Sequence, residues 1–227
     1  MGITMLNMEY FADKTLNCLG DSTTRGDNGV DGGSQGISWV SHVREYLPFR
    51  QVRNYGVCGS RIAVSSERDD SFVERYEQMD LEADDVIVFG GVNDFQHDIP
   101  LGDLDSRDVR TFSGALNTVL TGLQGLYPRA NIVALTATPN DFVHPTKQYP
   151  TTHQPNSLGL KQVDYVERMK AIGASYCIPV VDLFRLSGIS PFAPGHEEYM
   201  PDGLHYSQAG YARLCKRIIG LTLPYLI

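Results

Sequence analysis

The sequence predicts a three-layer α/β/α fold, in which helices cover both faces of a five-stranded parallel sheet. Short apolar segments of strand length alternate along the chain with longer segments of helical periodicity. Buried strands that are joined by helices form a parallel sheet between two helical layers. Because the 227 residues contain no linker-like tract and no internal repeat, we expect a single flavodoxin-like domain that spans residues 1–227.

The predicted strands are short apolar segments, and most of them end at glycine or shortly before proline. They cover residues 15–19, 51–55, 86–89, 132–136 and 179–183.

The predicted helices are indicated by apolar residues three or four positions apart, which line one face of a helix. Between residues 64 and 79 this pattern is weaker, and there we expect a helix only from about Ser71. The four clear stripes are Trp39, Val40, Val43 and Leu47; Phe112, Leu116, Val119, Leu120, Leu123 and Tyr127; Val163, Val166, Met169 and Ile172; and Tyr211, Leu214, Cys215, Ile218 and Ile219.

Charge and hydropathy exclude several classes of partner. The formal net charge is −8, and lysine and arginine are scattered without a basic stripe, whereas nucleic acid binding needs clustered cations. No segment is apolar enough to span a bilayer, and residues 1–14 lack a signal-length apolar run. The sequence therefore predicts a cytoplasmic protein without membrane insertion, although a secreted protein trimmed of its signal peptide would look the same.

The four cysteines, Cys18, Cys58, Cys177 and Cys215, contain no C-x-x-C pair. Cys18 and Cys177 lie in or beside predicted core strands, so we expect buried free thiols rather than a zinc site. Cys58 lies in a candidate site loop, but nothing near it in sequence argues for a lowered thiol pKa. With no metal-ligand spacing and no phosphate-binding loop, the sequence predicts neither a metal nor a cofactor.

Four polar, glycine-containing segments are expected to meet at one edge of the sheet. Residues 20–22, 56–59 and 91–93 each follow a predicted strand, and residues 202–205 precede the last predicted helix. Ligands of parallel α/β sheets bind beyond the carboxyl ends of the strands. The sequence therefore places one site at that edge.

Ser22 is the candidate nucleophile and His205 the candidate base, because a serine hydroxyl needs a base to remove its proton. Asp202 lies three positions before His205 and could accept its Nδ1–H, which would fix the tautomer. Asp182 is a rival partner for His205, but we interpret it as the cap of the segment that follows the fifth strand. We interpret Asp94 as a structural hydrogen-bonding residue.

Three groups are candidate donors to an oxyanion: the Ser22 amide, the Gly59 amide and the Asn93 side chain. Glycine lets its amide approach a substrate carbonyl closely, and asparagine supplies a side-chain N–H. Taken singly, each residue is better explained as a turn residue or a helix cap than as a catalytic residue. Their joint presence at one sheet edge favours a catalytic site.

In their order along the chain, these segments resemble the sequence blocks of the SGNH subgroup of the GDSL lipase/esterase superfamily. The resemblance places the nucleophile of that family on Ser22, its glycine on Gly59, its asparagine on Asn93, its histidine on His205 and its acid on Asp202. It implies a flavodoxin-like fold and metal-free hydrolysis of esters or thioesters.

Two long loops depart from the pattern of that family. Residues 27–36 form a glycine-rich insertion, and residues 140–156 carry Phe142, His144, Tyr149 and His153. Because long ordered loops are often functional, we expect the second loop to shape the acyl or alcohol pocket.

The sequence thus predicts a serine carboxylester hydrolase that uses a Ser-His-Asp triad and an acyl-enzyme. The expected partner is a small-molecule ester with a small acyl group, such as an acetylated carbohydrate, since no extended apolar lid is visible. Hydrolysis of lysophospholipids or acyl-thioesters remains open, as does a non-catalytic flavodoxin-like domain that binds a ligand. The residues do not indicate the oligomeric state.

Overall fold

The computed structural model describes residues 8–227, and its centre is a five-stranded parallel sheet. The strand order β2-β1-β3-β4-β5 is the flavodoxin-like order. Every neighbouring pair of strands is parallel, as predicted. The strands are β1 (Thr15–Gly20), β2 (Gln51–Gly56), β3 (Asp85–Gly90), β4 (Asn131–Thr136) and β5 (Val180–Val181).

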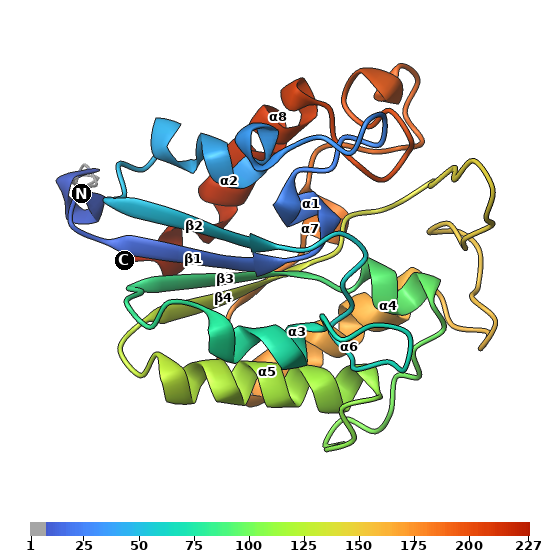
Figure 1. Cartoon of the computed structure of the whole chain (residues 1–227), viewed down its shortest axis with the longest axis horizontal. Coiled ribbons are helices and arrows are strands. Elements are labelled where there is room, and N and C mark those ends of the chain that lie inside the picture. Colours follow the sequence, from blue (N-terminus) through green and yellow to red (C-terminus); the bar gives the residue numbers. More distant parts are fainter. Residues whose placement is uncertain (1–7) are drawn as a thin grey trace, which may run out of the picture.

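Helices cover both faces of the sheet, which confirms the predicted three layers (Figure 1). On one face lie α2 (Trp39–His42) and α8 (Gln208–Thr222), and on the other lie α3 (Phe72–Arg75), α5 (Phe112–Leu126) and α6 (Gln162–Ser175). Three short helices follow strands directly at their carboxyl ends: α1 (Ser22–Arg25), α4 (Val92–Gln96) and α7 (Leu183–Leu186).

The two faces of the sheet explain why the inner strands β3 and β4 are almost continuously apolar, whereas the edge strand β2 is largely polar and only partly buried. In β1, Cys18 packs with the buried side chains of α2 and α8, whereas its neighbour Leu19 packs with those of α5 and α6. Successive side chains of a strand point to opposite faces, so a strand between two helical layers must be apolar at both positions. This burial removes apolar surface from water on both sides of the sheet.

Two predicted elements are shorter in the structure than expected. β5 is shorter than predicted because the Asp182 side chain accepts a hydrogen bond from the Arg185 amide and begins α7. The stripe from Trp39 to Leu47 is buried, but regular α-helix ends at His42 and a 3₁₀ turn follows, since Pro48 does not allow the helix to continue.

The buried stripe of α6 differs from the predicted one at one residue. Val163, which was predicted to belong to it, is only partly buried, and Tyr165 is buried instead. The region after residue 64 is helical from Phe72, with Ser71 as its cap, as expected. Ser71 and Glu74 form a capping box there, in which each side chain accepts a hydrogen bond from the backbone N–H of the other residue.

Two glycines allow α1 to lie directly against the strand ends. A Cβ at Gly20 would lie 2.0 Å from the hydroxyl of Thr24, and a Cβ at Gly56 would lie 2.1 Å from the backbone nitrogen of Arg25. Atoms of any side chain would therefore push α1 away from the sheet. The absence of a side chain at these two positions fixes where α1, and with it Ser22, begins.

We predict opposite effects of the same substitution at two glycines. Gly56→Ala is expected to destabilise the protein by about 1–3 kcal/mol, because the new methyl group meets backbone atoms that cannot move independently. Gly125→Ala, on the exposed side of α5 with nothing within 4 Å of the new atom, is expected to stabilise it by about 0.5–1 kcal/mol. Urea unfolding of both variants measures this, and a Gly56→Ala variant as stable as the parent would contradict the packing described.

Candidate active site

The structure brings the four predicted segments together at the carboxyl edge of the sheet. Ser22 is the first residue of α1, directly after β1, and Asn93 lies in α4 directly after β3. Asp21, not Ser22, caps α1, since its carboxylate accepts a hydrogen bond of 3.0 Å from the Thr23 amide. The capping role that could have explained Ser22 is therefore filled by its neighbour.

Ser22, His205 and Asp202 form one continuous chain of hydrogen bonds. The Nε2 atom of His205 lies 3.0 Å from the Oγ atom of Ser22, and its Nδ1 atom lies 2.6 Å from an oxygen of Asp202. An ionised carboxylate only accepts hydrogen bonds, so Nδ1 carries the proton and Nε2 presents its lone pair to the Ser22 hydroxyl. The arrangement fits proton transfer from Ser22 to His205.

Backbone amides hold the Asp202 carboxylate in this position. The second oxygen of Asp202 accepts hydrogen bonds from the amides of His205 (2.7 Å) and Leu204 (3.0 Å). The glycine-rich loop 27–36 closes the other side, because a Cβ at Gly29 would lie 2.4 Å from this carboxyl group. The carboxylate therefore has little freedom to turn away from the imidazole ring.

Burial and charge act in opposite directions on the base. Burial by itself lowers the pKa of His205, but the hydrogen bond and the charge of Asp202 outweigh it, and the pKa of His205 is raised from 6.5. For Asp202, burial raises the pKa, and the hydrogen bonds and charge of His205 reverse this, so that the pKa is lowered. Asp202 is thus ionised and stabilises a protonated His205.

The three candidate oxyanion donors lie on adjoining segments. The Asn93 side-chain nitrogen donates to the Ser60 carbonyl at 3.1 Å, which joins α4 to the loop of Gly59, and lies 3.4 Å from the Asp21 carboxylate beside Ser22. Within residues 8–227, the backbone amides of Ser22 and Gly59 donate no hydrogen bond to the protein. Two unused backbone donors thus flank one side-chain amide.

The two acidic residues set aside in the sequence analysis have structural contacts. Asp94 is buried, and its carboxylate accepts hydrogen bonds of 2.9 Å from the amides of Ile62 and Ala63, which anchor the loop after Gly59. Burial raises the pKa of Asp94 to about 6. Asp182 caps α7 and pairs with Lys170 and Arg185, so its contacts are with cations and not with His205.

Sequence reasoning missed Arg75, which connects the strand ends. Its guanidinium group donates to the carbonyls of Tyr55 (2.8 Å) and Gly20 (3.1 Å) and to the hydroxyl of Ser60 (2.9 Å). These three residues belong to the first two predicted site segments or lie next to them. No motif marks Arg75, because most of its partners are backbone carbonyls that become neighbours only when the sheet forms.

The irregular segment 140–156 lies against the segment of Asp202 and His205. The amides of Asp141 and Val143 donate to the carbonyls of Gly203 (2.9 Å) and Asp202 (3.0 Å). The Phe142 ring packs at right angles to the His205 ring, with 5.6 Å between their centroids. This loop, which contributes no helix or strand, is therefore attached to the candidate base (Figure 1).

Comparison with known proteins identifies the family of the chain. A family model described as the GDSL-like lipase/acylhydrolase family matches residues 18–213. The chain belongs to the GDSL-like lipase/acylhydrolase family. The match spans the segments that contain Ser22, Gly59, Asn93 and His205.

Solved structures extend the likeness beyond the family model. One is 45% identical, with 96% of this chain and 99% of that chain covered and a TM-score of 0.92. A protein from Lactobacillus plantarum is 28% identical over 95% and 99% of the two chains, with a TM-score of 0.81. A lipase/acylhydrolase from Enterococcus faecalis, 20% identical over 94% and 97% with a TM-score of 0.61, shares the fold. No curated protein matches the chain.

The cysteines of this GDSL-like chain lie in two environments. Cys18 and Cys215 are buried, whereas Cys58 and Cys177 are exposed. The prediction that Cys177 is buried was wrong, because this residue forms a left-handed surface turn (φ 55°) between α6 and β5. Partial burial and the nearby Asp27 carboxylate raise the pKa of the Cys58 thiol to about 11, so Cys58 is a poor nucleophile at neutral pH.

The described residues contain neither a group of metal-binding side chains nor a membrane-spanning helix. Across residues 8–227, no three histidine, cysteine or acidic side chains are grouped as the ligands of a metal ion. In the same part of the chain, every helix is too short or too polar to cross a bilayer.

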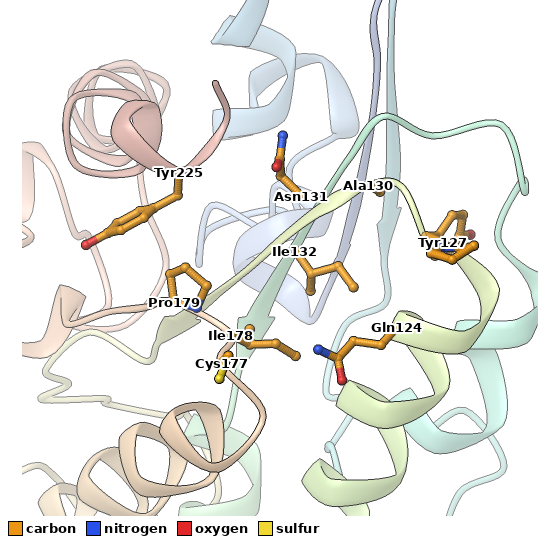
Figure 2. Close-up of a pocket in the computed structure, with 10 residues that line it drawn as sticks. Gln124, Tyr127, Ala130, Asn131, Ile132, Cys177, Ile178, Pro179 and Tyr225 are labelled. Carbon is orange, nitrogen blue, oxygen red and sulfur yellow. The ribbon is translucent and has the colours of Figure 1, made fainter.

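A hollow of about 390 Å³ lies at the opposite edge of the sheet from these segments. It is lined by residues at the start of β4, the end of α5 and the turn before β5, among them Gln124, Asn131 and Ile178 (Figure 2). None of the four candidate site segments of this chain lines it. The candidate active site and this hollow are therefore separated by the length of the strands.

We predict that the pKa of His205 depends on Asp202. In the parent protein we expect His205 to titrate above 6.5. In Asp202→Asn we expect it to titrate below the parent value, because the main group that opposes burial is lost and only the weaker effects of Asp27 and Asp21 remain. Asp182→Asn is the matched control and is expected to leave the titration unchanged. NMR titration of the His205 ring measures all three, and an unchanged pKa in Asp202→Asn would refute the pairing.

Proposed function

We propose that this chain is a serine carboxylester hydrolase with Ser22 as nucleophile, His205 as general base and Asp202 as the acid that orients it. The observation that carries the proposal is the chain of hydrogen bonds of 3.0 and 2.6 Å from Ser22 through His205 to Asp202. Membership of the GDSL-like lipase/acylhydrolase family, which implies an ester-hydrolysing enzyme, supports it independently.

In the first half-reaction, Ser22 Oγ attacks the carbonyl carbon of the ester while its proton passes to Nε2 of His205. The carbonyl oxygen becomes an oxyanion, which the amides of Ser22 and Gly59 and the side chain of Asn93 stabilise. The C–O bond to the alcohol then breaks, and the alcohol leaves with the proton held by His205. The product is an ester between the acyl group and Ser22.

In the second half-reaction, water attacks the acyl-enzyme and gives a proton to His205 Nε2. Collapse of the second oxyanion breaks the bond to Ser22 Oγ, which takes the proton back, and the carboxylic acid leaves. Asp202 stays ionised throughout, because its role is to hold the tautomer and to stabilise the imidazolium. The cycle needs water as its only co-substrate.

The enclosure of the reacting groups favours a small acyl group. The exposed fractions of Ser22, Asn93 and His205 are only 4%, 6% and 8%. A carbonyl that reaches Ser22 must therefore enter between tightly packed segments, which suits an acetyl group better than a long chain. We infer that the substrates are small acyl esters, of which acetylated carbohydrates are one class.

Replacement of the nucleophile is expected to abolish covalent labelling. A fluorophosphonate probe should label the parent protein, and Ser22→Ala should show no labelling and a loss of ester hydrolysis on the order of 10⁴-fold or more. Ser66→Ala, which removes the same group from an exposed residue, is the matched control and should retain both. Labelling that persists in Ser22→Ala would end the proposal.

The rate of hydrolysis is expected to fall as the acyl chain lengthens. With p-nitrophenyl esters, kcat/KM for the acetyl ester should exceed that for the octanoyl ester by about tenfold or more, since enclosed sites reject groups larger than their pocket. Initial rates across the series from acetyl to octanoyl measure this. A preference for octanoyl would overturn the small-acyl inference but not the nucleophile assignment.

A further inference from the structure

Four aromatic side chains form a continuous cluster beside the candidate site. This aromatic wall consists of Phe142, His144, Tyr149 and His97. Phe142 and Tyr149 are stacked at 5.5 Å between centroids, His144 contacts both of them at 5.9 and 5.7 Å, and His97 lies 5.4 Å from Tyr149. All four rings are only half-buried, so the wall presents ring surface to solvent.

The aromatic wall connects two of the site segments. At one end Phe142 packs on the His205 ring at 5.6 Å. At the other end the Nδ1 atom of His97 lies 3.0 Å from the carbonyl of Asn93. The aromatic wall thus extends from the His205 ring to the backbone of Asn93.

One of the two imidazoles of the aromatic wall favours its neutral form. Burial and the nearby Arg61 guanidinium lower the pKa of His97 from 6.5. The Nδ1 atom of His144 lies 3.1 Å from the amides of both Thr146 and Lys147, which fix the ring on its own loop. Behind Phe142 lies a small apolar cluster of Val92, Ala137 and Leu204.

From its position, the aromatic wall is expected to contact the alcohol portion of the substrate rather than the acyl group. In the proposed reaction the departing alcohol oxygen takes its proton from Nε2 of His205, so the alcohol must lie beside that ring. Phe142 is the aromatic side chain that packs on the His205 ring. An alcohol within reach of His205 is therefore also within reach of Phe142 and of Tyr149 stacked on it.

We propose that the aromatic wall binds the alcohol portion of the substrate, and that this alcohol carries a ring with a flat apolar face. Aromatic side chains gain most from a partner that covers their faces, and an aryl ring and the C–H face of a pyranose both offer such a surface. The inference rests on the proposed function, because it needs His205 to protonate the alcohol.

The test compares three acetate esters whose alcohols differ in the ring. They are benzyl acetate, a monoacetylated methyl glucopyranoside and the ringless butyl acetate. In Phe142→Ala and in Tyr149→Ala we expect kcat/KM to fall about tenfold for one or both ring-bearing esters and no more than about twofold for butyl acetate. A loss confined to the benzyl or to the glucoside ester identifies the kind of ring.

Tyr225→Ala is the matched control, since Tyr225 is an exposed aromatic residue beside the hollow at the opposite edge of the sheet (Figure 2). It should leave all three rates unchanged. An equal loss for all three esters in the aromatic-wall variants would overturn the proposal, because a disturbed His205 affects every ester alike.

A second pair of substrates separates the two sides of the ester bond. The ratio of rates for benzyl acetate and benzyl butyrate should be the same in the parent and in both variants, and a changed ratio would place the aromatic wall on the acyl side and refute the inference. Fluorophosphonate labelling of Ser22 in every variant distinguishes this failure from failure of the proposed function, in which no labelling occurs.

Discussion

The contact between α1 and the ends of β1 and β2 is the constraint on which the candidate site depends. Because Gly20 and Gly56 have no side chain, the backbone of α1 lies against the strand ends, and Ser22 begins the helix there. Arg75 then ties the carbonyls of Gly20 and Tyr55 together from the other side. The proposed nucleophile, Ser22, is thus positioned by backbone packing, which leaves its hydroxyl free to face His205.

The electrostatics of the site follow from its burial. An imidazole as enclosed as His205 would favour its neutral form, and the Asp202 carboxylate shifts the balance towards the charged form. The same low-polarity surroundings strengthen the hydrogen bond between the two side chains. Asp202 can supply this charge because two backbone amides and the loop of Gly29 hold its carboxylate in place, so the base is oriented before a substrate arrives.

The sequence was sufficient to predict the features that depend on periodicity and on parallel-sheet topology. The strands and the buried stripes of α5 and α8 follow from the alternation of apolar strand segments with helical periodicity. The proximity of Ser22 and His205 follows from the rule that sites of parallel sheets lie beyond the carboxyl ends of the strands. Features that depend on tertiary contacts were not predictable. Most Arg75 contacts are with backbone carbonyls, among them those at the ends of β1 and β2. The exposure of Cys177 follows from a left-handed turn that apolar periodicity does not encode.

The segment 140–156 links recognition to catalysis. Its rings form most of the aromatic wall, while its backbone donates hydrogen bonds to the carbonyls of Asp202 and Gly203 beside the base. Side chains on this segment can therefore change without moving the base, since the anchoring atoms belong to the backbone. A change in the path of the backbone would instead shift Asp202 and His205 together. In the proposed reaction, this separation lets one loop vary the alcohol that is accepted while the chain of hydrogen bonds to Ser22 stays intact.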